Sequence, residues 1–189
     1  MPIGIIVVLV LTQQHIEEMS AHAERVYPEE CCGLMLGSLG VQTAAAFRKK
    51  WLSELVPLTN EWVPDVLPVS SGVDVDAKEA NATSVHTKKR RYWVDPKDML
   101  RVQREAREKG LNIIGVYHSH PDHVAEPSEC DRALAWTEYA YIIVSVRKGK
   151  AVDVQNWALD SEHRFQPEAM EISPCAVSPG RTIQKVLLS

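Results

Sequence analysis

The feature that most constrains this chain is a short apolar run that ends in two histidines. The run begins at Ile113, and His118, Ser119 and His120 follow it directly. It predicts a buried β-strand, on which side chains two positions apart project to the same face. His118 and His120 are therefore expected to reach a single metal ion together.

A third ligand is predicted on a separate element. Asp131 follows a loop bounded by Pro121 and Pro127, and it falls at the start of a predicted helix. Two imidazoles and one carboxylate leave one position of a tetrahedral zinc ion open, which is typical of catalytic rather than structural sites. His123 offers an alternative third ligand, although a loop histidine beside Pro121 and Asp122 is more often only solvated.

Each piece of this pattern also has a purely structural interpretation. Ser128 and Asp131 match the Ser/Thr-x-x-Asp/Glu capping box, with Ser128 as the N-cap of a helix. A His-x-His run is common in loops, and Glu30 beside Glu29 would alone be interpreted as a solvated charge. The occurrence of all these residues together favours the metal site.

The combined pattern resembles the JAMM metalloprotease family, whose domain is also called MPN. The family signature is His-x-His, seven residues, Ser, two residues and Asp, and residues 121–127 fill the seven positions before Ser128. The family also has an upstream glutamate. Glu30 resembles it, because residues 27–37 are similar to the family segment Pro-x-Glu leading into Cys-Gly-Leu-Leu-Leu-Gly. The similarity covers roughly residues 11–172.

The motif predicts a zinc-dependent peptidase with one Zn(II) per chain. His118, His120 and Asp131 would hold the ion, which lowers the pKa of a bound water from about 15.7 towards 7. Glu30 would take the proton of that water as general base and deliver it to the leaving amine. Ser128 would donate a hydrogen bond to the oxyanion, in competition with its capping role.

The substrate is implied by the resemblance alone. Family members typically cut after the C-terminal glycine pair of ubiquitin-like proteins, and small bacterial members release cysteine or another adduct from a ubiquitin-like sulfur-carrier protein. We therefore expect such a carrier or its conjugate as the substrate. Two alternatives stay open, an isopeptidase that removes a ubiquitin-like modifier from proteins and a non-catalytic MPN-type scaffold. A DNA-repair branch of the family carries Asn where this chain has Ser119.

Composition and charge argue against several other classes of function. The net charge of −4 and the lack of a basic stripe argue against nucleic acid as a partner, and residues 88–91 are the one basic cluster. The apolar residues 3–11 are too few to span a bilayer, so no membrane role is expected. The four cysteines lack disulfide or Cys-x-x-Cys spacing, which predicts a reducing, cytoplasmic location.

Two kinds of side chain near or outside the motif are interpreted as structural. Cys130 lies between Ser128 and Asp131, but no dedicated base is placed for a thiol nucleophile, so a small packed helix residue is favoured. Four other histidines lack metal-ligand spacing and are expected on the surface or on helix faces: His15, His22, His86 and His163.

The pattern of elements predicts an α+β fold, a mixed β-sheet flanked by helices in a single JAMM/MPN-like domain. Strands are expected over residues 3–11, 32–37, 41–47, 51–58, 113–117, 141–146 and 151–159. Helices are expected over residues 13–26, 96–109 and 128–138, the first capped by Thr12 and the second by Asp95. The domain is expected to span residues 1–172, with a flexible insertion over 59–90 and an unassigned tail over 173–189.

Overall fold

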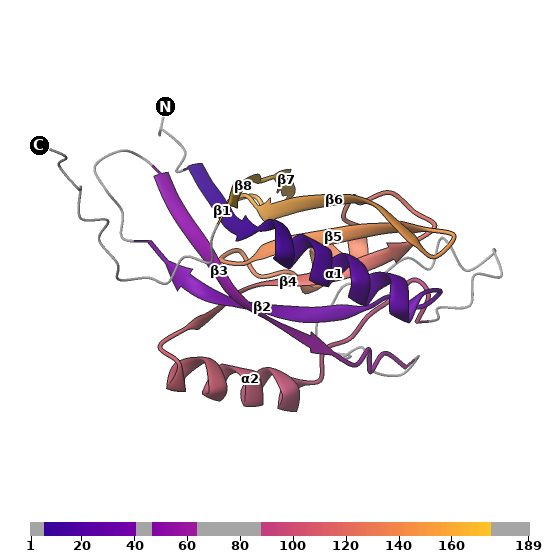
Figure 1. Ribbon diagram of the computed structural model, residues 1–189, viewed down its shortest axis with the longest axis horizontal. Helices are drawn as coiled ribbons and strands as arrows, with labels where there is room; N and C mark the ends of the chain where they lie inside the picture. The colour runs from indigo at the N-terminus through magenta and orange to yellow at the C-terminus, as the bar shows by residue number, and fades with distance from the viewer. Residues whose placement is uncertain (1–5, 41–46, 64–87, 175–189) are drawn as a thin grey trace, which may run out of the picture.

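The computed structural model describes residues 6–40, 47–63 and 88–174, which form one mixed sheet of eight strands with three helices (Figure 1). The strand order is β7-β6-β5-β4-β2-β3-β1-β8. The strands are β1 (Ile6–Thr12), β2 (Cys32–Leu39), β3 (Phe47–Leu58), β4 (Asn112–Pro121), β5 (Ala140–Arg147), β6 (Lys150–Leu159), β7 (Phe165–Pro167) and β8 (Ala169–Ser173). The helices are α1 (Gln13–Val26), α2 (Pro96–Glu108) and α3 (Glu129–Leu134). The predicted α+β class is confirmed.

Strand β4 lies inside the sheet and carries the two histidines. It pairs antiparallel with β2 and parallel with β5, so that His118 is opposite Cys32 on one side and Ile143 on the other. The strand is buried without interruption from Ile114 to Pro121, as expected where both faces of a sheet are covered. The histidines are therefore held by an element that cannot shift without disturbing its neighbours.

Two hydrophobic clusters cover the two faces of the sheet. Met19 and Ala23 of α1 pack in one cluster, and Val102 and Ala106 of α2 pack in the other. The two helices accordingly lie on different sides of the sheet (Figure 1). Alternation along a strand assigns His118 and His120 to the face covered by α2.

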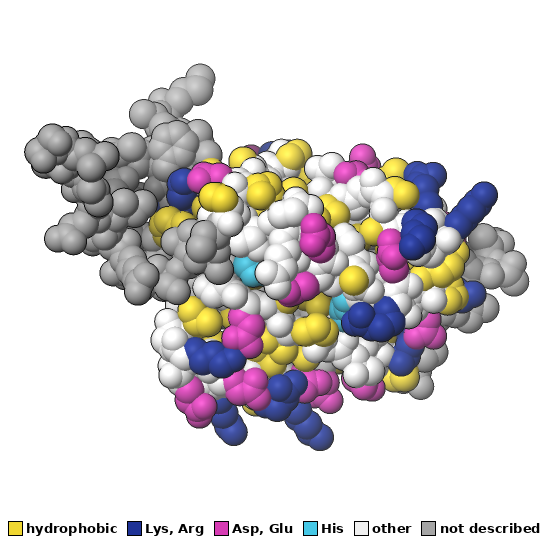
Figure 2. Space-filling view, viewed as in Figure 1, with side chains coloured by type: hydrophobic (Ala, Val, Ile, Leu, Met, Phe, Trp, Pro, Cys, Tyr) yellow, Lys and Arg dark blue, Asp and Glu magenta, His cyan; other side chains and the backbone are white. Residues whose placement is uncertain are grey.

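Helix α2 presents a charged surface on the side away from the sheet. Its predicted N-cap, Asp95, accepts a hydrogen bond from the backbone N–H of Lys97 at 2.7 Å. Outside, Arg101 forms ion pairs with Asp98 and Glu105 at 2.8 and 3.1 Å. Charged side chains follow this helix in the space-filling view (Figure 2). The helix therefore contributes its inner stripe to the core and its outer face to solvent.

Helix α1 confirms its predicted boundaries but buries two histidines. The Thr12 hydroxyl accepts a hydrogen bond from the backbone N–H of His15 at 3.2 Å, and His15 Nδ1 accepts one from the backbone N–H of Thr12 at 3.2 Å. His15 and His22 are only 7% and 6% exposed, so of the two expected positions, the surface or a helix face, both occupy a helix face, on the buried side of α1. His163 is exposed as expected, and His86 lies outside the described residues.

Several predicted element boundaries need correction. β3 is one strand from Phe47 to Leu58, because the charged residues 48–50 continue it where the sequence indicated a break; residues 41–46 lie outside the described residues. Helix α3 ends at Leu134 rather than at residue 138. Strands β7 and β8 were not predicted, since their largely exposed residues give little apolar alternation.

Parts of the predicted insertion and tail also lie outside the described residues, over 64–87 and 175–189. Among the described residues, no helix is long and apolar enough to cross a membrane.

The burial of His22 gives a testable dependence of stability on pH. Its Nδ1 lies 2.9 Å from the Tyr117 hydroxyl oxygen, and burial lowers the pKa of His22. Because the unfolded chain binds the proton more readily, the contribution of His22 to the free energy of unfolding is fully present above about pH 6.5 and is lost as the pH drops below it. His22→Asn, which can keep the bond to Tyr117 without titrating, is expected to make this decline shallower. Urea denaturation of the chelator-treated wild type and His22→Asn variant, over about pH 7.5 to 5, measures this decline. Equal slopes of the free energy of unfolding against pH would contradict the prediction.

Candidate metal centre

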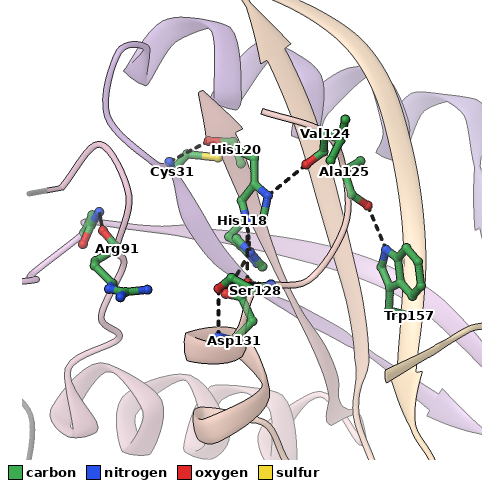
Figure 3. A network of polar contacts seen from close by, with 11 residues as sticks. Cys31, Arg91, His118, His120, Val124, Ala125, Ser128, Asp131 and Trp157 are labelled. Carbon is green, nitrogen blue, oxygen red and sulfur yellow. Dashed lines mark hydrogen bonds and ion pairs between the residues drawn. The ribbon is translucent and has the colours of Figure 1, made fainter. Parts of the chain in front are cut away.

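Three side chains converge where β4 ends and α3 begins (Figure 3). His118 Nε2 lies 3.1 Å from His120 Nε2 and 3.2 Å from Asp131 Oδ1, and His120 Nε2 lies 3.6 Å from Asp131 Oδ2. All three offer ligand atoms within 4.8 Å of one another. Ligand atoms around a tetrahedral zinc ion with bonds of about 2.0 Å are separated by about 3.3 Å. The spacing fits one ion of this size.

The loop from β4 to α3 is held against the neighbouring strands, and this fixes the direction from which Asp131 approaches. Ser145 Oγ of β5 donates to the carbonyl oxygen of His123 at 2.6 Å. Trp157 Nε1 of β6 donates to the carbonyl oxygen of Ala125 at 2.9 Å (Figure 3). The loop is thus anchored at two points between the histidines and the helix.

His120 is oriented by a hydrogen bond. Its Nδ1 lies 3.0 Å from the carbonyl oxygen of Val124, which can only accept, so Nδ1 carries the proton and Nε2 presents its lone pair to the cluster. Burial alone would lower the pKa of His120, but the Asp131 carboxylate, the charge of Glu30 and the hydrogen bond to Val124 together outweigh it, and the net pKa is raised. The ring is therefore directed toward Asp131 and His118.

His118 is oriented by packing instead. The residue is 0% exposed, and among the described residues its Nδ1 has no hydrogen-bond partner. The ring of Tyr92 stacks on it, with centroids 4.5 Å apart and planes inclined by 26°. Burial lowers the pKa of His118, which keeps the imidazole neutral and able to bind a cation.

Asp131 supplies a buried anion to the cluster. Burial would raise the pKa of this carboxyl, but His118 and His120 hold it well below its usual range. Its Oδ2 also accepts a hydrogen bond from the backbone N–H of Ser128 at 2.6 Å. Two imidazole nitrogens, which bind a cation when the ring is neutral, and one carboxylate form a set of ligands that suits zinc.

Ser128 takes the capping role that the sequence also predicted. Its Oγ accepts from the backbone N–H of Asp131 at 3.2 Å and donates to Asp131 Oδ2 at 2.6 Å. The hydroxyl proton is thus directed at the carboxylate. To donate to a substrate oxygen, the hydroxyl must turn away from Asp131.

Glu30 lies just before β2 and is buried rather than solvated, with 5% of its surface exposed. Its backbone N–H donates to the carbonyl oxygen of Lys88 at 2.8 Å. Burial raises the pKa of Glu30 to about 8. The charge of His120 lowers this pKa, and the charge of Asp131 raises it. A cation nearby would favour the ionised carboxylate. Glu30 is not one of the three converging ligands.

Two alternative assignments are not supported by the geometry. His123 is exposed, its Nε2 lies 3.0 Å from a guanidinium nitrogen of Arg90, and it is outside the converging group. Burial raises the pKa of the Cys130 thiol, which disfavours the reactive thiolate. The His-His-Asp set therefore remains the candidate.

Two residues that contact residues of the site were not predicted from the sequence: Tyr92 stacks on His118, and the side chain of Asn60 bonds the backbone carbonyl of Glu30. Tyr92 lies between the basic cluster and the start of α2, and Asn60 follows the end of β3 within the expected insertion. Neither belongs to a periodic segment or a motif. Only the contacts made after folding reveal them.

Comparisons with known proteins identify the family of the chain. Residues 12–160 match the family described as prokaryotic homologs of the JAB domain. The chain is similar to proteins named CysO-cysteine peptidase from Mycobacterium tuberculosis and Mycobacterium bovis, with 28% identity over 145 residues, 76% of this chain and 77% of theirs. It is also 36% identical over 55 residues to the desampylase of Haloferax volcanii, which is 29% of this chain and 40% of that protein.

Solved structures show the same fold. A protein from Desulfitobacterium hafniense aligns with a TM-score of 0.60 at 24% identity, covering 89% of this chain and 93% of the other. A protein from Salinibacter ruber aligns with a TM-score of 0.57 at 29% identity, covering 88% and 94%. The predicted JAMM/MPN resemblance is confirmed, and the chain belongs to the prokaryotic homologs of the JAB domain.

Proposed function

We propose that this protein is a zinc-dependent peptidase that hydrolyses the amide bond after the C-terminal glycine of a ubiquitin-like sulfur-carrier protein. The observation that carries the proposal is the convergence of His118, His120 and Asp131 on one point. It occurs in a chain whose relatives include named peptidases. The converging residues would form the metal site at which the amide bond is hydrolysed.

The three converging residues would hold one Zn(II) per chain. When bound, zinc supplies a water of lowered pKa and a Lewis acid for the substrate carbonyl. His118 and Asp131 contribute from different elements, so the ligand set forms only in the folded chain. The metal is therefore expected to stabilise the native state as well as to serve catalysis.

Glu30 and Ser128 would handle protons at the reacting bond. Glu30 would accept a proton from the attacking water and deliver it to the departing amine nitrogen, a role that suits a buried carboxylate beside the cluster. Ser128 would rotate its hydroxyl from Asp131 toward the oxyanion, where one such donor contributes about 2.7 to 4 kcal/mol. The N–H of Ser128 continues to hold Asp131 during this rotation.

The substrate class rests on the named relatives. The CysO-cysteine peptidases align over most of both chains, which supports a carrier–cysteine conjugate as substrate and free cysteine as one product. The desampylase match, although shorter, supports a second candidate, removal of a ubiquitin-like modifier from proteins. We place the enzyme in the cytoplasm, supported by three free cysteines among the described residues.

The ligand assignment predicts which substitutions weaken zinc binding. Asp131→Ala is expected to weaken zinc affinity by more than about tenfold. About tenfold is the smallest loss of affinity that is typical when a residue contacting a ligand, rather than the ligand itself, is removed. His123→Ala is the matched control, because this exposed histidine is the alternative ligand and should leave affinity unchanged. Competition with a chromophoric chelator measures both. The assignment is wrong if the control loses zinc and Asp131→Ala keeps it.

The role of Glu30 predicts a separation of metal binding from turnover. Glu30→Gln keeps the shape of the side chain but removes the base, so turnover is expected to fall by about 10² to 10⁴. Zinc content should stay at one per chain, since Glu30 is outside the ligand set. Metal analysis and initial rates on the same preparation test this. Near-full activity in the variant would exclude Glu30 as the base.

The two substrate candidates are distinguished by intact mass. The zinc-loaded protein is incubated with a sulfur-carrier–cysteine conjugate and, separately, with an isopeptide-linked conjugate of the same carrier. We expect release of cysteine from the first at a higher rate than cleavage of the second. Faster cleavage of the isopeptide would favour the second candidate. No cleavage of either by the zinc-bound protein would favour the non-catalytic scaffold.

A further inference from the structure

Asn60 is a buried residue whose side chain, within the part of the chain that the structure describes, bonds only to backbone groups. It is 6% exposed and lies two positions after the end of β3. Its Nδ2 donates to the carbonyl oxygens of Glu30 at 3.0 Å and Arg91 at 2.9 Å. Its Oδ1 accepts from the backbone N–H groups of Trp62 at 3.1 Å and Trp93 at 3.2 Å. One amide thereby joins three separate segments of the chain.

These four bonds use the full capacity of the amide, which has two N–H donors and two acceptor lone pairs. The orientation of the group is unambiguous, because both partners of Nδ2 are acceptors and both partners of Oδ1 are donors. Asp and Gln would not reproduce the set, since Asp lacks the donors and Gln is longer by one methylene. The site is therefore specific for Asn.

One end of this junction holds Glu30. The carbonyl of Glu30 is bound by Asn60, and its N–H is bound by the carbonyl of Lys88 at 2.8 Å. Ser119, between the two histidines, binds the next residue, because its Oγ accepts from the Cys31 N–H at 2.9 Å. The backbone that carries the Glu30 carboxyl is thus fixed on both sides and tied to β4.

The other end holds Tyr92. Asn60 bonds the residue before it, Arg91, and the residue after it, Trp93, so the backbone of Tyr92 is bracketed by a single side chain. Tyr92 stacks on His118, whose Nδ1 has no hydrogen-bond partner among the described residues. Metal-binding histidines are normally oriented by a hydrogen bond at the other ring nitrogen, as His120 is by Val124. Here the stacked ring takes that place.

We propose that Asn60 is a positioning residue that sets Glu30 and, through Tyr92, His118 in their places around the metal. The inference rests on the proposed function for the roles of Glu30 and His118. Asn60 touches neither metal nor substrate, and it acts only through the segments it joins. The coupling is expected to be reciprocal, so that metal binding also tightens the hydrogen bonds of Asn60.

The test compares Asn60→Ala with Asn156→Ala. Asn156 is a matched control, because it is 3% exposed and its Nδ2 bonds Glu168 rather than any of the metal-site residues described above. Each full-length variant is titrated with Zn(II) against a chelator and with Co(II), whose visible absorption reports ligand geometry. Asn60→Ala is expected to raise the zinc dissociation constant about tenfold and to alter the Co(II) spectrum. Asn156→Ala should change neither.

A double-mutant cycle identifies the route. In a Tyr92→Leu background, the effect of Asn60→Ala on zinc affinity should shrink, because the connection to His118 is already lost. An additive effect would show that Asn60 does not act through Tyr92 and would overturn that part of the proposal.

The outcomes separate this inference from the proposed function. If the wild type binds no zinc, the metal centre itself fails. If the wild type and Asn60→Ala bind zinc alike, with identical Co(II) spectra, Asn60 is only structural and the inference is overturned. If Asn60→Ala does not fold, hydrogen exchange of the wild-type amides decides. Zinc should then raise the protection of the Trp62 and Trp93 N–H groups more than that of the Glu168 N–H, which donates to the backbone carbonyl oxygen of Asn156. Equal increases would contradict the coupling.

Discussion

The burial of β4 on both faces of the sheet is the constraint on which the site depends. Polar groups are costly to bury without partners, and this strand carries two imidazoles into the interior. The surrounding structure meets most of that requirement with Asp131 for both rings and the Val124 carbonyl for His120. Among the described residues, only Nδ1 of His118 is left without a hydrogen bond on these rings, and the Tyr92 ring stacks on that imidazole. The nitrogen lone pairs that remain are directed toward one point. A cation bound at that point, as proposed, would balance the buried carboxylate.

The pairing of β2 with β4 then brings in the proposed base. Cys32 is opposite His118, and Cys31 exchanges backbone and side-chain hydrogen bonds with Ser119. The next residue toward the N-terminus is Glu30, so antiparallel register places it beside His120. A slip of the register would move the carboxylate to a different histidine or away from both. The register of two strands therefore fixes the geometry of a site whose parts are distant in the chain.

The sequence predicted those parts of the site that depend on residues close together in the chain. His118, His120, Ser128 and Asp131 lie within a local motif. Strand alternation predicts that the two imidazoles share a face, and the spacing of the motif adds Asp131 as the third ligand. The caps of α1 and α2 are local as well, and both were predicted at the correct residues, Thr12 and Asp95. Local rules suffice where the chemistry depends on spacing.

Other features depend on packing between distant segments and could not be predicted in this way. Tyr92 contacts His118 and Asn60 contacts Glu30 only because the sheet brings their segments together. The parallel pairing of β8 with β1 likewise has no local signal. The burial of His22 follows from Tyr117 projecting toward α1, which the sequence of the helix alone does not show.

The most direct test of the central claim is X-ray absorption at the zinc edge of the zinc-loaded protein. The account predicts four nitrogen or oxygen neighbours at about 2.0 to 2.2 Å, with the outer-shell scattering of two imidazoles and one non-protein oxygen in the first shell. Sulfur at about 2.3 Å, or scattering from a single imidazole, would contradict the His118, His120 and Asp131 centre.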